Sequence, residues 1–342
     1  MRSERSLALV IGGCGFVGQA LVEQLLAAGR PVRVLDLMAY PDPHVESIVG
    51  DLRRPDDVER ACAGAGSVFL CAAAVDWGWG RVQWLHEVNV AGPRHVIAAC
   101  HSQQVPRLIY TSSVDVVFDG RPIRNGDETL PYPRQHLDVY GTTKAAGEQL
   151  VLAANGVAGL ATCSLRLGGV YGPNDVHRLP ALVKFGWRGP IPRLGSGSAH
   201  FSHVYVENAA HAHLLAEKHL TLDSPLAGEA YFIVDPHPGN FFLFLQPILE
   251  ALGMQMATRP VPFRLAYALA LVSELWHRTT RSKRRPSLTR YTVTSTCVDF
   301  WFSHAKAQRD FGYHPLVNQD AAYQRTIAWA RQAFGLPQAD RE

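Results

Sequence analysis

A tyrosine and a lysine with the spacing of a helical pair lie near the middle of this 342-residue chain. Lys144 follows Tyr140 by four residues, so a helix would place the phenol and the ammonium group on one face. An isolated phenol has a pKa of about 10 and is a poor acid–base catalyst at neutral pH. A nearby cation stabilises the phenolate and lowers that pKa, which suits the pair to moving a proton to or from an oxygen.

A serine hydroxyl is expected beside this pair. Residues 107–110 predict a buried strand, which delivers Thr111, Ser112 and Ser113 to its carboxyl end. The Ser113 hydroxyl can hydrogen-bond a substrate oxygen as charge shifts onto it. A tyrosine and a lysine at this spacing also occur by chance on surface helices, so the meaning of the pair depends on the elements around it. Ser113, Tyr140 and Lys144 are the predicted catalytic residues.

The elements that position these side chains begin with a glycine turn. Residues 7–11 form a short uncharged apolar run, typical of a strand buried on both faces, and residues 19–28 predict a helix. Gly12, Gly15 and Gly18 lie between the two. This order brings backbone N–H groups and a helix N-terminus to one point, which suits a pyrophosphate.

A carboxylate follows at the spacing that a dinucleotide site requires. The next predicted strand ends in Asp36, eighteen residues after Gly18, where a carboxylate meets the adenosine ribose hydroxyls. Strand and helix signals then alternate, which predicts an α/β fold with a Rossmann-type, doubly wound parallel sheet and ligands at the carboxyl ends of its strands. The expected cofactor contacts are Gly12, Gly15, Phe16, Val17, Gly18, Asp36, Asp51, Leu52, Ala72, Ala73, Asn89, Thr111, Tyr140, Lys144, Leu167, Gly168 and Val170.

The alternation of strands and helices is interrupted once, which predicts two parts. The dinucleotide-binding part is expected to comprise residues 1–167 and about 203–235. Residues 168–202 and 236–342 are expected to form a smaller, mainly helical part that binds the substrate. The Pro- and Gly-rich composition of residues 175–198 marks the departure from the first part.

Composition excludes several classes of protein. Hydrophobic residues make up 47% and charged residues 18%, as in globular proteins, and a net charge of +3 is too small to imply nucleic acid. The six scattered cysteines favour a reducing compartment. No signal peptide is expected, and no apolar stretch approaches the roughly 20 residues of a membrane span. We therefore expect a cytoplasmic protein. No metal is predicted, because His211 and His213 lack the spacing of a chelating pair.

From Val10 to about residue 330 the chain resembles an extended short-chain dehydrogenase/reductase. The GxxGxxG motif of that family corresponds to the three glycines, its acidic cofactor selector to Asp36, and its catalytic triad to Ser113, Tyr140 and Lys144. Within the superfamily the chain is similar to the 3β-hydroxysteroid dehydrogenases, above all to the sterol-4α-carboxylate 3-dehydrogenases. The stretches that carry this likeness are residues 116–120, 125–133, 165–173 and 311–315.

The resemblance implies NAD-dependent oxidation of a 3β-hydroxyl on a sterol- or steroid-like lipid, with loss of carbon dioxide where that lipid carries a 4α-carboxylate. Asp36 favours NAD because a carboxylate repels a 2′-phosphate, although Arg33 and Arg53 leave NADP open. Two alternatives are a ketoreductase of another lipid or aryl ketone, such as a long-chain 3-oxo acid, and a non-catalytic NAD(P)-sensing protein. Residues 199–202 lack the Arg-Asp pair of nucleotide-sugar relatives, which argues against an epimerase.

Two further segments bear on the substrate and the partners. Residues 263–276 are mostly apolar and a basic run follows to residue 285, so residues 263–285 fit an amphipathic helix on a membrane surface or a core helix with a solvated loop. The expected partner is a small hydrophobic, sterol- or steroid-like substrate. Peripheral contact with a membrane is a further possibility, and the family resemblance implies that the chain could form a homodimer. Trp77 and Trp79, near a strand end, could line a flat apolar slot for the substrate or could serve as packing anchors. The residues predicted for the substrate are Asp76, Trp77, Trp79, Asp115 and Val116.

Overall fold

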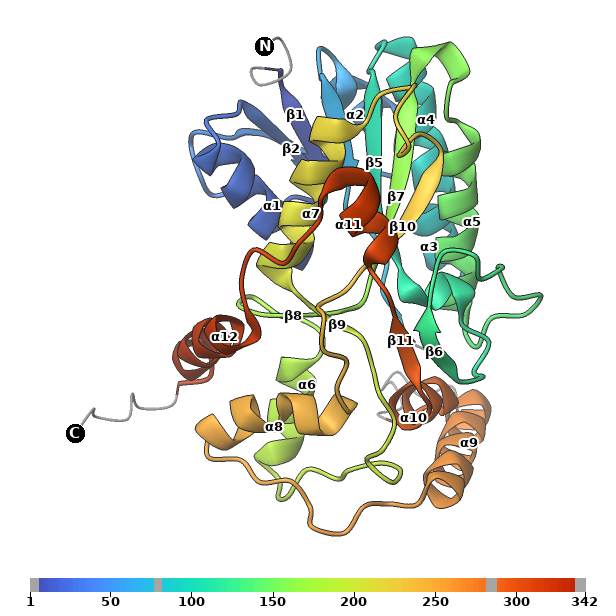
Figure 1. Ribbon diagram of the computed structural model, residues 1–342, viewed down its shortest axis with the longest axis vertical. Coiled ribbons are helices and arrows are strands. Elements are labelled where there is room, and N and C mark those ends of the chain that lie inside the picture. The colour runs from blue at the N-terminus through green and yellow to red at the C-terminus, as the bar shows by residue number, and fades with distance from the viewer. Residues whose placement is uncertain (1–5, 77–81, 281–287, 336–342) are drawn as a thin grey trace.

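The computed structural model describes residues 6–76, 82–280 and 288–335, and it is built around one parallel sheet (Figure 1). Seven strands pair in parallel in the order β10-β7-β5-β4-β1-β2-β3. This order confirms the predicted doubly wound sheet. The strands are β1 (Ala8–Ile11), β2 (Val32–Asp36), β3 (Glu46–Val49), β4 (Ser67–Leu70), β5 (Arg107–Ser113), β7 (Ala161–Leu167) and β10 (Glu229–Ile233).

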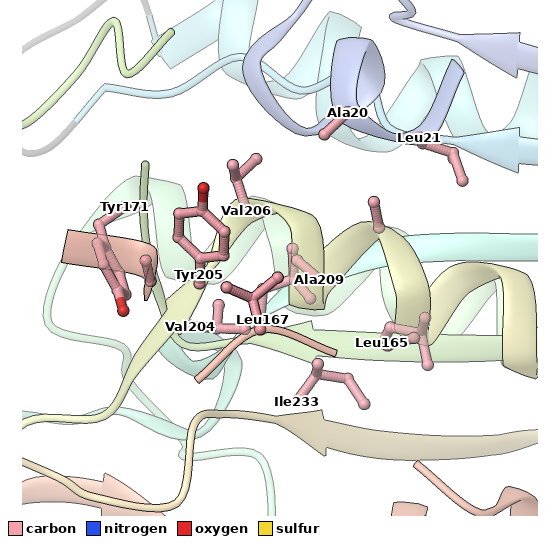
Figure 2. Packing of buried hydrophobic residues seen from close by; sticks show 14 of the residues in the cluster. Ala20, Leu21, Leu165, Leu167, Tyr171, Val204, Tyr205, Val206, Ala209 and Ile233 are labelled. Carbon is pink, nitrogen blue, oxygen red and sulfur yellow. The ribbon is translucent and has the colours of Figure 1, made fainter. Parts of the chain in front are cut away.

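Helices cover both faces of this sheet because successive strand residues point to opposite sides. Val10 on β1 packs with helices α1 and α7, whereas its neighbours Leu9 and Ile11 pack with α2, α4 and α5. Figure 2 shows the first of these layers, in which Leu165 and Ile233 lie beneath α7. The covering helices are α1 (Phe16–Ala27), α7 (Val206–His219), α2 (Pro55–Cys62), α4 (Gly92–Ser102) and α5 (Val139–Ala153).

Two stretches differ in detail from the prediction. The apolar pattern of residues 203–206, before a helical pattern at 208–219, predicts a strand that returns to the nucleotide-binding sheet, but this strand does not enter the main sheet. As β9 (His203–Tyr205) it pairs with β8 (Gly169–Tyr171), and β10 is the strand that joins the sheet edge instead. The sequence from about residue 84 to residue 101 predicts a single helix, whereas the structure has α3 (Val82–His86), a π-helical turn (Glu87–Ala91) and α4 there.

Most of the remaining elements lie beyond the carboxyl ends of the strands, in the lower half of Figure 1, whereas α11 (Ala305–Phe311) packs against β10 and α7 beside the sheet. A second two-stranded parallel sheet, β6 (Ile123–Gly126) with β11 (Phe300–Phe302), borders them. Among the described residues no helix is both long and apolar enough to cross a bilayer. The helices are α6 (Leu179–Gly186), α8 (Phe241–Ala251), α9 (Phe263–Thr280), α10 (Arg290–Cys297), α11 (Ala305–Phe311) and α12 (Gln319–Ala333).

Candidate active site

The turn between β1 and α1 leaves no room for a side chain at Gly12 or at Gly18. Gly12 has φ +87°, and a Cβ atom there would stand 2.5 Å from the backbone nitrogen of Ala72. A Cβ atom on Gly18 would overlap the carbonyl oxygen of Gly12. Helix α1 begins at Gly15 with no side-chain cap and no acidic residue in its first turn, so its N–H groups can meet an anion.

The Asp36 carboxylate is held beside this turn at the end of β2. Its Oδ2 accepts a hydrogen bond of 2.9 Å from the backbone N–H of Cys14, and its Oδ1 accepts one of 2.7 Å from that of Leu37. An uncapped helix N-terminus, a glycine-rich loop and a fixed carboxylate together fit the pyrophosphate and ribose of a dinucleotide.

One cavity of about 1150 Å³ extends from the glycine turn into the smaller helical part. It is lined by every residue predicted to contact the cofactor except Asn89, and by Ser113, Tyr140 and Lys144. Asp76 and Asp115 also line it. Its far end is mostly apolar, and the residues there include Leu182, Phe185, Ile191, Leu194, Phe201, Phe241, Phe242, Val261, Ala266, Leu269 and Leu288.

Asn89 and Val116 lie behind the cavity wall. The Asn89 amide, in the π-helical turn, donates to the Ala74 carbonyl at 2.9 Å and to Thr143 Oγ1 at 3.1 Å, so it ties the end of β4 to α5. Val116 is fully buried in the core with Phe118, which corrects its predicted place among the substrate residues. Trp77 and Trp79 lie outside the described residues.

Tyr140 and Lys144 lie in the first turns of α5, which starts where Asp138 caps it by accepting from the backbone N–H of Gly141 at 2.8 Å. The Lys144 ammonium donates to the Thr111 carbonyl at 2.7 Å and lies 4.2 Å from the centroid of the Tyr110 ring. Burial lowers the pKa of Lys144 to about 7, against the opposing effect of the Glu148 charge.

The pKa of Tyr140 is raised above its usual value, opposite to the direction that the neighbouring lysine alone predicts. Burial is the largest cause, and the nearby carboxylates of Asp115 and Asp138 act in the same direction. An interaction with the Ser113 hydroxyl opposes them. The phenol therefore holds its proton in the protein alone, because the loss of water and the two carboxylates disfavour the phenolate.

A buried hydrogen-bond network holds Ser113. The Ser113 hydroxyl donates to Asp115 Oδ2 at 2.7 Å, and the Tyr291 hydroxyl donates to Asp115 Oδ1 at 2.6 Å. Burial raises the pKa of the Asp115 carboxyl, and these two hydrogen bonds oppose the shift. Tyr291 lies on α10, far from Ser113 in the chain, and no motif in its own neighbourhood could have revealed this contact.

His213 fixes the strand end from the other side of the sheet. Its Nδ1 lies 2.7 Å from the carbonyl oxygen of Ala209, so Nδ1 carries the proton, and Nε2 accepts from the Thr111 hydroxyl at 2.7 Å. Burial lowers the pKa of this imidazole to about 4. In the described part of the chain no group of three or more His, Cys, Asp or Glu side chains could hold a metal ion.

Known proteins are similar to this chain in both sequence and fold. The model of the 3-beta hydroxysteroid dehydrogenase/isomerase family matches residues 9–264. The decarboxylating sterol-4-alpha-carboxylate 3-dehydrogenase of Mus musculus is 35% identical, over 95% of this chain and 91% of its own length. The 2-alkyl-3-oxoalkanoate reductase of Stenotrophomonas maltophilia is 36% identical, over 94% of this chain and 98% of its own length.

Solved structures place the chain in the same superfamily. The crystal structure of gox2253 has a TM-score of 0.75 at 26% identity, and the alignment covers 96% of this chain and 99% of that one. The UDP-glucose 4-epimerase of Thermus thermophilus, in complex with NAD, has a TM-score of 0.71 at 25% identity, with the same coverage. With the family match, these likenesses show that the chain belongs to the 3-beta hydroxysteroid dehydrogenase/isomerase family of extended short-chain dehydrogenases/reductases.

Proposed function

We propose that this protein is an NAD-dependent dehydrogenase that oxidises the 3β-hydroxyl of a sterol- or steroid-like lipid. The observation that carries the proposal is a single cavity with three distinct regions. The glycine turn and Asp36 lie at one end, Ser113, Tyr140 and Lys144 in the middle, and an apolar wall at the other. The reaction converts a secondary alcohol and NAD⁺ into a ketone, NADH and a proton.

The cofactor end supports NAD over NADP. Asp36 would accept hydrogen bonds from the adenosine ribose hydroxyls and would repel a 2′-phosphate. The two arginines that could offset this repulsion are engaged elsewhere. Arg33 donates to the carbonyls of Ala61 and Ala63, and Arg53 forms an ion pair with Asp51 at 2.6 Å. The structural relative from Thermus thermophilus, which is described as a complex with NAD, points the same way.

Three side chains supply the proton chemistry in this proposal. Tyr140, as the phenolate that Lys144 stabilises, takes the proton of the substrate hydroxyl and becomes a neutral phenol. Ser113 orients the substrate oxygen, held in place by Asp115 and Tyr291. When NAD is bound, its nicotinamide ring provides the hydride acceptor. Because burial raises the pKa of Tyr140, oxidation is expected to speed up as the pH rises above neutrality.

The test is NADH formation from a 3β-hydroxysterol by the wild type and by Tyr140→Phe. Loss of the proton-transfer group is expected to lower kcat by about 100- to 10,000-fold, with NAD binding unchanged. Tyr231→Phe is the matched control, because that hydroxyl bonds Pro225 and Asp310 away from the cavity. Unchanged turnover in Tyr140→Phe would overturn the assignment of the proton acceptor.

A second candidate is reduction of an open-chain 3-oxo acid, which is favoured by the likeness to the 2-alkyl-3-oxoalkanoate reductase. The same three side chains would then return a proton to the substrate oxygen. A panel of 3β-hydroxysterols with NAD and 3-oxo acids with NADH separates the two. If only the open-chain acids are turned over, the second candidate replaces the sterol as the proposed substrate.

Peripheral membrane contact through α9 is also part of the proposal. Ala266 and Ala270 face the interior, whereas the opposite side of the helix exposes Leu265, Leu269, Val272 and Trp276. Leu269 also lines the cavity, so the exposed apolar face borders the substrate end. The basic run that follows at residues 281–285 lies outside the described residues. An apolar helix face of this kind fits the acyl boundary of a bilayer, from which a lipid substrate could enter.

A further inference from the structure

Arg178 is a cation in the apolar end of the cavity that no described side chain neutralises by contact. It lies at the start of α6 and lines the cavity. Its Nη1 atom is buried and has no hydrogen-bond partner within the described residues. Buried guanidinium groups in proteins are normally paired, because leaving water without a partner is costly. Arg178 therefore has donors to offer to something that enters the cavity.

Packing holds the guanidinium in place without using its donors. Its central carbon lies 4.9 Å from the centroid of the Phe201 ring and 5.3 Å from that of Phe241. Nη1 rests against Gly169, where any side chain would collide with it. The arginine is thus presented on an aromatic wall in a fixed position, as a binding residue needs to be.

The charged groups around Arg178 are occupied with other partners. Asp175 accepts the backbone N–H groups of His177, Arg178 and Leu179 through both of its oxygens, at 2.7–3.0 Å. Asp115 accepts from Ser113 and Tyr291. His203, also nearby, is neutral, because burial holds its pKa well below the usual value. Burial lowers the pKa of Arg178 itself, although the charge of Asp175 opposes this.

The sheet register places Arg178 close to the reacting centre. Ser113 pairs with Leu167 across β5 and β7, and Gly169 is two residues further along the chain. Gly169, against which Nη1 rests, therefore closely follows the strand end opposite Ser113, and the charges of Asp115 and Tyr291 both act on Arg178. A ligand group bound by the guanidinium would therefore be attached within a few bonds of the carbon that Ser113 and Tyr140 address.

We propose that Arg178 binds a carboxylate of the substrate and selects a hydroxy acid over the neutral alcohol of the same shape. The planar fork of a guanidinium matches the two oxygens of a carboxylate, which makes this the best-fitting anion. The inference rests on the proposed function and narrows its substrate class to β-hydroxy acids and their β-oxo products. The carboxylate remains unchanged in the oxidation and serves as the point of recognition.

The experiment compares 3-hydroxyhexadecanoate with its methyl ester, for binding and for turnover. Calorimetric titration into the protein in the presence of NADH measures affinity without reaction. Wild type is expected to bind the acid about 10- to 100-fold more tightly than the ester, the effect of one charge-assisted hydrogen-bonded pair. Arg178→Met should abolish that preference and Arg178→Lys should restore part of it. Arg188→Met, an exposed arginine just beyond α6, is the matched control.

The outcomes separate this inference from the proposed function. If the acid binds through Arg178 but is not oxidised with NAD, the inference stands, and the proposed reaction is decided separately by NADH formation from the 3β-hydroxysterol. If wild type binds acid and ester equally, or if Arg178→Met weakens both to the same extent, the inference is overturned even where turnover is observed. In the kinetic measurements, Arg178→Met is expected to raise the KM for the acid and to leave the kcat for the ester unchanged.

Discussion

Replacing Glu148 by glutamine should destabilise the fold more than any surface charge change of the same size. Glu148 is fully buried and forms an ion pair with Arg166 at 2.7 Å. It also accepts from the hydroxyls of Ser164 and Tyr132, both at 2.6 Å. A glutamine would keep one acceptor oxygen and turn an NH₂ group towards these donors. It would also leave the buried guanidinium of Arg166 without a counter-charge.

The size of the effect follows from the burial of both partners. Breaking a buried ion pair by removing one member costs about 3–5 kcal/mol, because the remaining charge stays in the interior. The Lys306–Glu229 pair has a similar separation of 2.6 Å, but the Glu229 side chain is 52% exposed. Exposed pairs of this kind contribute about 0–1 kcal/mol. Glu229→Gln is therefore a matched control.

The assay is urea unfolding followed by circular dichroism, which gives the free energy of unfolding for each variant. Burial raises the pKa of Glu148, but Arg166 and the hydrogen bonds lower it more, so the net pKa lies below the usual value. The stabilisation by the ionised form is present above the unfolded pKa of about 4.3 and is lost as the pH falls through the folded pKa. A loss at neutral pH no larger than that of Glu229→Gln would refute this reasoning.

Three further outcomes are expected. Gly18→Ala should weaken NAD binding at least about 100-fold in a fluorescence titration, since the added Cβ meets the loop backbone, whereas Gly239→Ala, where the added Cβ makes only ordinary contact with Phe244, should not. Asp36→Asn should lower the preference for NAD over NADP by about 10-fold in KM, by removing charge repulsion. Sedimentation with anionic lipid vesicles should fall sharply when serines replace three exposed side chains of α9, and unchanged sedimentation would contradict a membrane role for this face. These are Leu265, Val272 and Trp276.

Much of the fold could be predicted because its signals are local. A short apolar run, a glycine turn and a helix specify one βα unit, and their repetition specifies a parallel sheet. The position of β10 could not be predicted from such local signals. Its residues 229–233 lie in a stretch without clear periodicity, and their place at the sheet edge depends on pairing with β7. Residues 203–206 have a stronger strand pattern, yet pair with β8 outside the main sheet.

The residues of the candidate site likewise divide into those that local sequence signals predict and those that only tertiary packing brings there. Tyr140 and Lys144 could be found because one helix sets their spacing, and the structure brings both to one cavity with Ser113. Tyr291 and Arg178 reach that cavity through tertiary packing alone, so no spacing announces them. The pKa of Tyr140 could not be predicted in sign, because it depends on burial and on the carboxylates of other segments. Asn89 was expected to contact the cofactor but lies behind the wall, where a π-helical turn directs it to Ala74.

The edge position of β10 also has a consequence for synthesis of the protein. Cys163 on β7 and its register partner Glu229 are 66 residues apart in the chain. At about 5–20 residues per second, a ribosome needs roughly 3–13 s to extend from one to the other. During that interval an apolar strand presents unpaired N–H and C=O groups, the usual template for association between chains. A chaperone that covers β7 should therefore raise the yield of soluble protein.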